Sequence, residues 1–284
     1  MLIIFILLFL VLLLGSLMLF AGRAFSIKPI PHERDPAEFD IPFREIHFLT
    51  RNNRILYGWW IPGKELEKLP TLILVHGWKR NVGRMLTYIR HLYPHGFNLL
   101  AFDSRQHGSS DEDGYSTMVK FAEDIRAALE FMASEDLPMG RLGLIGLSLG
   151  GAASLYASAL DDRIRTVVSV GAPAHPWDVI RYDMQQRRIP YFPLVWFMKH
   201  YFRWRLGFSM DDIAPENNIK KTKIPYLFIH GSEDITVPPE HARRLKDAAG
   251  NRGTLWMLPG RGHSDCHQDQ DFWPKLINYL NINL

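Results

Sequence analysis

Cysteine is almost absent from this sequence: Cys266 is the single one among 284 residues. One thiol cannot close an internal disulfide, and no Cys/His pairs have the close spacing of a zinc site. The fold must therefore be held together by its hydrophobic core. We expect no metal and no other cofactor.

A strong excess of charge of one sign is also missing. The chain has 33 Lys and Arg against 30 Asp and Glu, a formal net charge of +3, and no run of basic residues. Nucleic-acid binding depends on clustered positive charge, so it is set aside. With 47% hydrophobic and 22% charged residues, the composition is that of an ordinary globular protein.

Charge is wholly lacking from residues 1–22, MLIIFILLFLVLLLGSLMLFAG. A helix rising about 1.5 Å per residue would cross the roughly 30 Å hydrocarbon layer over this length. A cleaved signal peptide is the alternative, but it has a basic start and a shorter apolar core. We therefore expect an uncleaved, single-pass membrane anchor. The nearby basic residues Arg23, Lys28 and Arg34 all follow it, so the positive-inside rule favours a cytoplasmic location for the rest of the chain.

Beyond this segment the sequence predicts a stalk, residues 23–42, with four prolines and mixed charges, and then one domain, residues 43–284. Residues 44–61 predict two short strands around an Arg-Asn-Asn-Arg turn. Continuous apolar runs then alternate with segments of helical periodicity, which is typical of a mainly parallel sheet covered by helices on both faces. The runs are TLILVHG (71–77), NLLAFDS (98–104), LGLIGLS (142–148), TVVSVGA (166–172), IPYLFIHG (224–231) and GTLWMLPG (253–260).

The alternation is interrupted at residues 173–219, where we expect an inserted helical cap. This segment is rich in aromatic residues. Leu194, Phe197, Met198 and Tyr201 form an apolar stripe at helical spacing, with Lys199 and Arg203 away from it. The stripe either packs onto the domain as a lid or also touches the bilayer, since aromatic and basic residues suit the headgroup region. The candidate substrate-contacting residues here are Trp177, Trp196, Phe197 and Tyr201.

One serine lies between a buried run and an alanine-rich helix, in LGLIGLSLGGAASLYA (142–157). Gly146, Ser148 and Gly150 form the motif GxSxG at this strand-to-helix junction. Such a sharp turn strains the backbone at the serine, so its neighbours must be small for the hydroxyl to project. Free N–H groups at the helix start favour a negatively charged oxygen there. Ser148 is therefore the candidate nucleophile; the alternative is a small-residue stretch that merely permits tight packing.

A serine hydroxyl needs a histidine base, and the histidine needs an acid to orient it. His263 follows the last apolar run on the loop PGRGHSD, which places it at the same sheet edge as Ser148. The acid is expected between them in the sequence. Asp234, in HGSEDITVPP, is the candidate, with the adjacent Glu233 as the alternative; an Asp here can also simply cap the following turn.

Backbone amides are expected to complete this site. The N–H groups of Trp78 and Leu149 would form an oxyanion hole for a tetrahedral intermediate. For His76, Asp103 and His107, which follow the first two buried runs, we expect contacts that fix the loops.

Taken together, these motifs resemble those of the α/β-hydrolases. LVHGW, FDSRQHGSS, GLSLGG, HGSEDITVPP and PGRGH occur in the family's order of serine, acid and histidine, over about residues 43–284. The resemblance implies a mainly parallel eight-stranded sheet and a serine hydrolase acting through an acyl-enzyme, with Ser148 as nucleophile, His263 as base and then acid, and Asp234 as its orienter. Family members with an Asp nucleophile, such as haloalkane dehalogenases and most epoxide hydrolases, are disfavoured because Ser148 occupies the elbow.

Within the family, the apolar N-terminus and the cap make the chain most similar to membrane-anchored serine hydrolases of the monoacylglycerol-lipase and acylaminoacyl-peptidase-like branches. The expected reaction is hydrolysis of a carboxylic ester, of a lipid or other acyl compound. Thioesterases and peptidases use the same machinery, and the sequence does not separate these activities or set the oligomeric state. A non-catalytic protein that keeps the pocket for binding is the alternative of another class.

Overall fold

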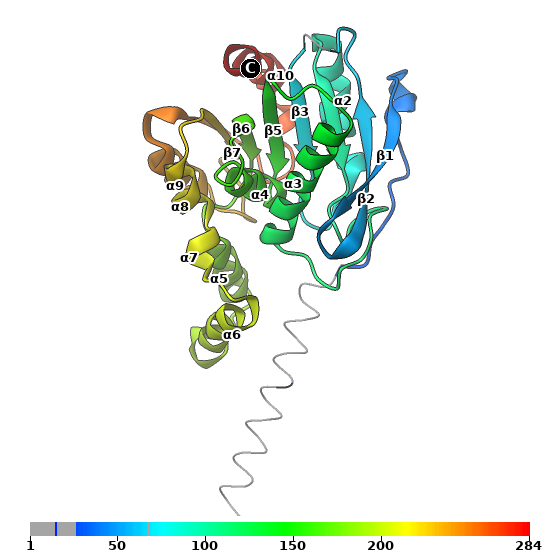
Figure 1. The fold of residues 1–284 in the computed structure, drawn as a ribbon. Helices are drawn as coiled ribbons and strands as arrows, with labels where there is room; N and C mark the ends of the chain where they lie inside the picture. The colour runs from blue at the N-terminus through cyan, green and yellow to red at the C-terminus, as the bar shows by residue number, and fades with distance from the viewer. Residues whose placement is uncertain (1–14, 16–26, 67–68) are drawn as a thin grey trace, which may run out of the picture.

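The computed structural model describes residue 15, residues 27–66 and residues 69–284 (Figure 1). The expected membrane anchor, residues 1–22, lies outside the described residues except for residue 15, as does the beginning of the stalk. Among the residues that are described, no helix has the length and apolar character needed to cross a bilayer.

The domain opens with the predicted hairpin. Strands β1 (Arg44–Thr50) and β2 (Arg54–Ile61) pair antiparallel around a short 3-10 turn. Asn52 and Asn53 in this turn have φ values of 60° and 53°, a left-handed conformation that Asn adopts more readily than most residues.

Eight strands form one sheet in the order β1-β2-β4-β3-β5-β6-β7-β8. Strand β2 runs antiparallel to both its neighbours, whereas every pairing from β4 to β8 is parallel. The mainly parallel sheet predicted from the apolar runs is thus confirmed. The remaining strands are β3 (Thr71–Val75), β4 (Asn98–Phe102), β5 (Leu142–Leu147), β6 (Ile164–Val170), β7 (Tyr226–Gly231) and β8 (Gly253–Leu258).

Helices cover both faces of this sheet, as Figure 1 shows. Neighbouring residues of β3 face opposite ways: Ile73 and Val75 pack in one hydrophobic cluster, Leu72 and Leu74 in the other. Because both faces are buried, a central strand needs an unbroken apolar run. One face packs against α3 (Met118–Ser134), α4 (Leu149–Ala157) and α9 (Glu240–Ala249), the other against α2 (Leu86–Leu92) and α10 (Phe272–Asn283).

The connection between β6 and β7 is helical, and we call residues 173–219 the helical insertion. It contains α5 (Pro176–Gln186), a π-helical turn (Tyr191–Val195), α6 (Trp196–Leu206), α7 (Met210–Ile213) and α8 (Pro215–Asn218). In Figure 1, α5, α6 and α7 project beyond the body of the sheet. A small cluster of their own holds them together: Trp177, Met184, Val195 and Met198.

The predicted apolar stripe of the helical insertion is borne out only in part. Met198 is buried at 1% exposure, but Phe197, expected on the same side, is 42% exposed. Consecutive residues on a helix point about 100° apart, so a narrow contact with the cluster buries one and leaves the other outside. The side chains of Leu194 and Tyr201, the other two members of the stripe, are outside the structure's description.

Candidate active site

Ser148 lies at the junction of β5 and α4, with φ 51° and ψ −117°. A residue with a side chain rarely adopts such angles, and it keeps them only where its surroundings hold it. The backbone N–H of Ser148 donates to the carbonyl oxygen of Val170 at 2.8 Å, and its carbonyl oxygen accepts from Ala152 N–H at 3.0 Å. The strand on one side and the helix on the other therefore fix the strained turn.

Two glycines of the motif are required by packing. A Cβ atom on Gly146 would run into the backbone of Gly150 and Gly151. A Cβ atom on Gly150 would run into the carbonyl oxygens of Val75 and His76. These obstacles are backbone atoms of fixed elements, so the GxSxG spacing follows from the close approach of α4 to β3 and β5.

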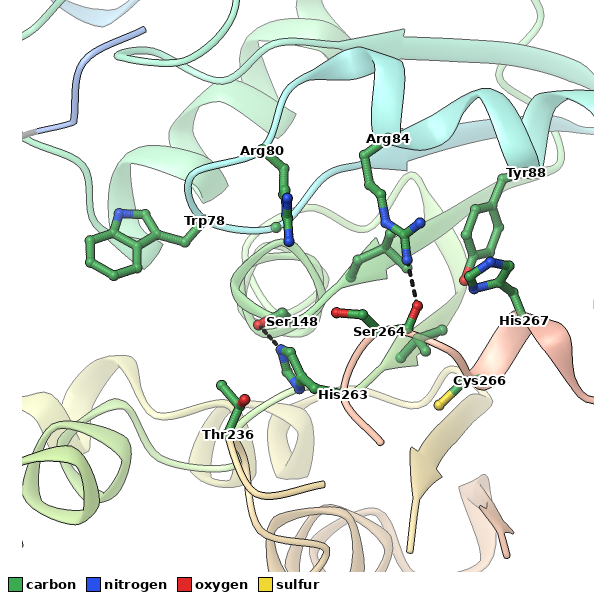
Figure 2. A pocket seen from close by; sticks show the side chains of 13 residues that line it. Trp78, Arg80, Arg84, Tyr88, Ser148, Thr236, His263, Ser264, Cys266 and His267 are labelled. Atoms are coloured by element: carbon green, nitrogen blue, oxygen red, sulfur yellow. Dashed lines mark hydrogen bonds between the residues drawn. The ribbon is translucent and has the colours of Figure 1, made fainter. Parts of the chain in front are cut away.

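The structure brings together the three residues predicted to form the relay. His263 Nε2 lies 2.9 Å from Ser148 Oγ, and His263 Nδ1 lies 2.6 Å from Asp234 Oδ2. Figure 2 shows the first of these hydrogen bonds. A carboxylate only accepts, so Nδ1 carries the proton and Nε2 is left to accept from the serine hydroxyl. This is the arrangement in which an imidazole can take a proton from an attacking serine.

Asp234 is held as a carboxylate. Its Oδ1 accepts from the backbone N–H groups of Thr236 and Val237, each at 2.9 Å, and His230 Nε2 lies 3.2 Å from Oδ2. Burial by itself raises the pKa of Asp234, but the hydrogen bonds from His230 and His263 outweigh it and hold that pKa well below its usual range. Glu233, the alternative acid, is exposed and takes no part in the relay.

His230 is a residue of this site that the sequence analysis missed. It is buried at the end of β7, and its Nε2 also lies 2.8 Å from the carbonyl oxygen of Val237. The one available signal was its place in the HGSED stretch, four residues before Asp234. Position alone does not distinguish it from an ordinary buried histidine.

The loop after β3 lies against the serine. A Cβ atom on Gly77 would stand 3.2 Å from the carbonyl oxygen of Leu147 and 3.4 Å from Ser148 Cβ. His76 Nε2 accepts from Ser104 N–H at 3.0 Å, so its Nδ1 carries the proton and donates to the Gly77 carbonyl at 2.7 Å. Burial, with a smaller effect of His107, lowers the pKa of His76 to about 3, which keeps the ring neutral.

This contact of His76 also sets the direction of an amide. The carbonyl of Gly77 and the N–H of Trp78 belong to one planar trans peptide group, in which the two bonds point opposite ways. Fixing the carbonyl therefore fixes the Trp78 N–H. The loop-fixing role expected for His76 is confirmed.

Asp103 and His107 fix the same loop from the neighbouring strand. Asp103 Oδ1 accepts from Val82 N–H at 2.5 Å, and its Oδ2 accepts from Ser109 N–H at 2.8 Å. His107 Nε2 accepts from Lys79 N–H at 3.2 Å. The expected loop contacts of both residues are confirmed.

A pocket of about 330 Å³ opens beside Ser148 and His263. Most of its remaining lining comes from residues 77–88 and from residues 264–267 after β8 (Figure 2). Cys266 is part of this lining; burial above all raises the pKa of its thiol to about 12, so the thiol is protonated at neutral pH. Within the described part of the chain, no group of three or more His, Cys, Asp or Glu side chains is placed to hold a metal ion.

The four aromatic residues proposed from the sequence to contact substrate are not among the residues that line this pocket. Trp177 is buried inside the helical insertion, whereas Trp196 and Phe197 are 39% and 42% exposed. The side chain of Tyr201 falls outside the structure's description. A contact of these residues with substrate stays a prediction.

Comparisons with known proteins agree with this architecture. A family model described as alpha/beta hydrolase fold matches residues 70–193. An uncharacterized protein of Bacillus subtilis, YqkD, is 27% identical over 216 residues, which are 73% of this chain and 70% of that protein. An uncharacterized membrane protein of Saccharomyces cerevisiae, YNL320W, is 23% identical over 256 residues, 88% of this chain and 83% of that protein.

Among solved structures, the esterase Pf2001 of Pyrococcus furiosus superposes with a TM-score of 0.73 at 20% identity, covering 90% of this chain and 98% of that one. At this identity the likeness concerns the fold. The eight-stranded sheet, the order of its motifs and these comparisons show that the chain has the α/β-hydrolase fold.

Proposed function

We propose that this protein is a serine hydrolase that cleaves a carboxylic ester through an acyl-enzyme. The observation that carries the proposal is the continuous series of hydrogen bonds from Asp234 through His263 to Ser148 at the wall of a pocket. A Pyrococcus furiosus protein of the same fold is described as an esterase, which favours an ester over a thioester or a peptide.

In the proposed reaction, Ser148 Oγ attacks the ester carbonyl carbon while His263 Nε2 takes the hydroxyl proton. The tetrahedral intermediate expels the alcohol, which leaves with that proton, and the acyl group stays on Ser148. A water then attacks the acyl-serine, again giving its proton to Nε2, and the acid departs as Oγ regains the proton. Asp234 holds the ring and stabilises its positive charge at each step.

The proposed oxyanion hole consists of the backbone N–H groups of Trp78 and Leu149. The first is oriented through the Gly77 carbonyl, and the second lies at the first position of α4, where an N–H has no partner within the helix. Removal of one such donor typically lowers kcat by about 10²–10³-fold.

The test of this function is covalent labelling with a fluorophosphonate probe together with hydrolysis of p-nitrophenyl butyrate. The wild-type chain should react at Ser148 and hydrolyse the ester, and Ser148→Ala should do neither. A wild-type protein that resists the probe and hydrolyses no ester would contradict the proposal and favour a non-catalytic binding protein. The matching p-nitrophenyl thioester and anilide measure thioesterase and peptidase activity in the same assay.

We further propose that the enzyme works at a membrane, with residues 1–22 as a single-pass anchor, the domain on the cytoplasmic side and the helical insertion as a cap that meets lipid. The insertion exposes large aromatic side chains: Phe192 is 70% and Trp204 73% exposed. Aromatic rings beside cations such as Lys199 suit the headgroup region. The yeast relative is described as a membrane protein.

Liposome flotation tests this membrane contact. Residues 27–284 alone should bind liposomes that contain anionic lipid, and Phe192→Ser with Trp204→Ser should weaken that binding. If residues 27–284 do not float with the liposomes, lipid contact by the insertion is contradicted, but the proposed anchor is not.

A further inference from the structure

Positively charged side chains gather at one side of the pocket. Arg80 and Arg84, from the segment that joins β3 to α2, both line it, and Figure 2 shows both pointing toward the side that holds Ser148 and the His263 loop. His267, which follows the same loop, lines the pocket as well. Among the described residues that line the pocket there is no Asp or Glu.

Arg80 is exposed and Arg84 is partly buried. Their pairing differs from that of the buried Arg105 and the partly buried Arg244. Arg105 is paired with Asp124 at 2.7 Å, and Arg244 with Glu216 at 2.5 Å. Within the described part of the chain, Arg80 and Arg84 form no ion pair with a carboxylate. A guanidinium has five N–H donors, so both side chains can offer charge and hydrogen bonds to an anion in the pocket.

Arg84 is nevertheless held in place. One of its N–H groups donates to the carbonyl oxygen of Ser264 at 2.7 Å, as Figure 2 shows. That contact orders the side chain without neutralising it, so its other donors stay available in a fixed direction. Ser264 directly follows His263, and the charge is therefore tied to the loop that carries the proposed base.

The position of Arg84 determines which part of an ester substrate lies near its charge. In the proposed reaction, His263 Nε2 delivers a proton to the departing alcohol oxygen, so the alcohol lies on the side of His263. The arginine bound to the His263 loop is then closer to the alcohol part of an ester than to the tail of its acyl chain. Burial above all, and Arg84 in second place, lower the pKa of His267, which favours the neutral ring with its one N–H donor.

The geometry points to an anion-binding subsite beside the nucleophile, formed by Arg80, Arg84 and His267, which takes an oxyanion such as a phosphate carried by the alcohol part of the ester. This inference rests on the proposed esterase function and narrows its substrate class. The preferred substrate is an acyl ester of a phosphorylated alcohol rather than a neutral ester.

A matched pair of esters tests the subsite: monobutyrylglycerol and its phosphate monoester, which differ only in the charged group. With the full chain, kcat/KM for the phosphate ester should exceed that for the neutral ester by about tenfold or more, because hydrogen bonds to charged groups contribute strongly. Arg84→Gln and Arg80→Gln should each reduce this ratio by about tenfold, mainly through KM for the phosphate ester. Arg84→Lys, which keeps the charge but not the fork of donors, should retain part of the ratio.

Arg90→Gln is the matched control, because Arg90 lies on α2, which directly follows the segment that carries Arg80 and Arg84, and does not line the pocket. It removes the same charge and should keep the wild-type ratio. A wild type without preference for the phosphate ester in both the butyryl and the palmitoyl pair, or an equal loss in Arg90→Gln, would overturn the subsite. The palmitoyl versions of both esters distinguish the source of the anion. A phosphate preference seen only with the palmitoyl pair assigns the anion to a lipid headgroup. A phosphate preference seen with the butyryl pair as well shows that soluble phosphate esters are also bound.

A binding measurement separates this inference from the proposed function. Full-length Ser148→Ala should bind glycerol phosphate more tightly than glycerol in calorimetry, and the added Arg84→Gln substitution should abolish the difference. If no ester is hydrolysed but this binding is seen, the esterase proposal fails and the anion site stands. If esters are hydrolysed but glycerol phosphate binds no better than glycerol, the subsite alone is overturned.

Discussion

Four donors converge on the two carboxylate oxygens of Asp234: two backbone N–H groups on Oδ1 and two imidazoles beside Oδ2. Each hydrogen bond favours the charged form, so the group serves as a fixed negative charge and not as a proton acceptor. The orientation of His263 depends on that charge. His230, which is buried, supports that charge as well.

Replacement of Asp234 by Asn should therefore remove most of the activity while leaving the fold intact. The amide can present an N–H group toward His263 Nδ1, which favours the tautomer with the proton on Nε2. That ring cannot accept the serine proton, and kcat is expected to fall about 10⁴-fold. The measurement is steady-state hydrolysis of p-nitrophenyl butyrate. Glu233→Gln, at the exposed neighbour, serves as the control; a larger loss there than in Asp234→Asn would assign the acid to Glu233.

His76 acts on the site through a peptide group and not by contact with substrate, and this role can be measured. In His76→Leu the Gly77 carbonyl loses its donor, the Trp78 N–H is no longer held, and kcat should fall by about 10²-fold, with little change in KM. The rate of fluorophosphonate labelling at Ser148 should fall in parallel. Unchanged labelling in a variant that still folds by circular dichroism would show that the loop holds its shape without His76.

At the scale of the element, the turn from β5 into α4 depends on residues without side chains. Gly150→Ala places a Cβ atom against the carbonyl oxygens of Val75 and His76, and overpacking of this kind costs about 1–3 kcal/mol in the free energy of unfolding. Activity should fall with stability, since Ser148 lies two residues away. Chemical denaturation measures the change.

Gly140→Ala is the matched control for that substitution. A Cβ atom on Gly140 would meet no heavy atom within 4 Å, and this glycine does not have a positive φ. Its replacement should leave stability unchanged or raise it by roughly 0.4–1 kcal/mol, because alanine restricts the unfolded chain. Equal destabilisation by the two changes would contradict the packing argument.

The elements differ in how well the sequence predicted them, for physical reasons. Burial on both faces leaves a continuous apolar run, so the central strands and the serine at the end of one of them were readable. The exposure of Phe197 could not be predicted, because helical spacing does not tell how narrow the contact between α6 and its small core is. Arg80 and Arg84 belong to no sequence motif, and only the structure shows that both line the pocket.

At the scale of the whole molecule, buried neutral histidines make folding sensitive to acid. Burial, with a smaller effect of Arg244, lowers the pKa of His241 to about 4, while in the unfolded chain a histidine titrates near 6.5. Between these values the unfolded state binds the additional proton, so stability is lost as the pH falls from about 6.5 to about 4.

The expected loss from His241 is at most about 1.4 kcal/mol per pH unit, and His241→Gln should remove that component. Urea denaturation at pH values across this window measures the slope of the free energy of unfolding for both proteins. His95→Gln, at an exposed turn, should leave the slope as in the wild type. A slope that is the same in His241→Gln would show that this ring takes up its proton in the folded state.

The relay is assembled from loops that follow three different parallel strands, and its hydrogen-bonded partners lie 115 and 29 residues apart in the chain. The proposed reactivity of Ser148 should therefore appear only when β5, β6, β7 and β8 have assembled into one sheet. In a refolding experiment, fluorophosphonate labelling of Ser148 would report the time at which the sheet is complete. Labelling should begin later than the circular dichroism signal of helix formation. The time at which Ser148 becomes reactive would then report when the last step of folding is complete.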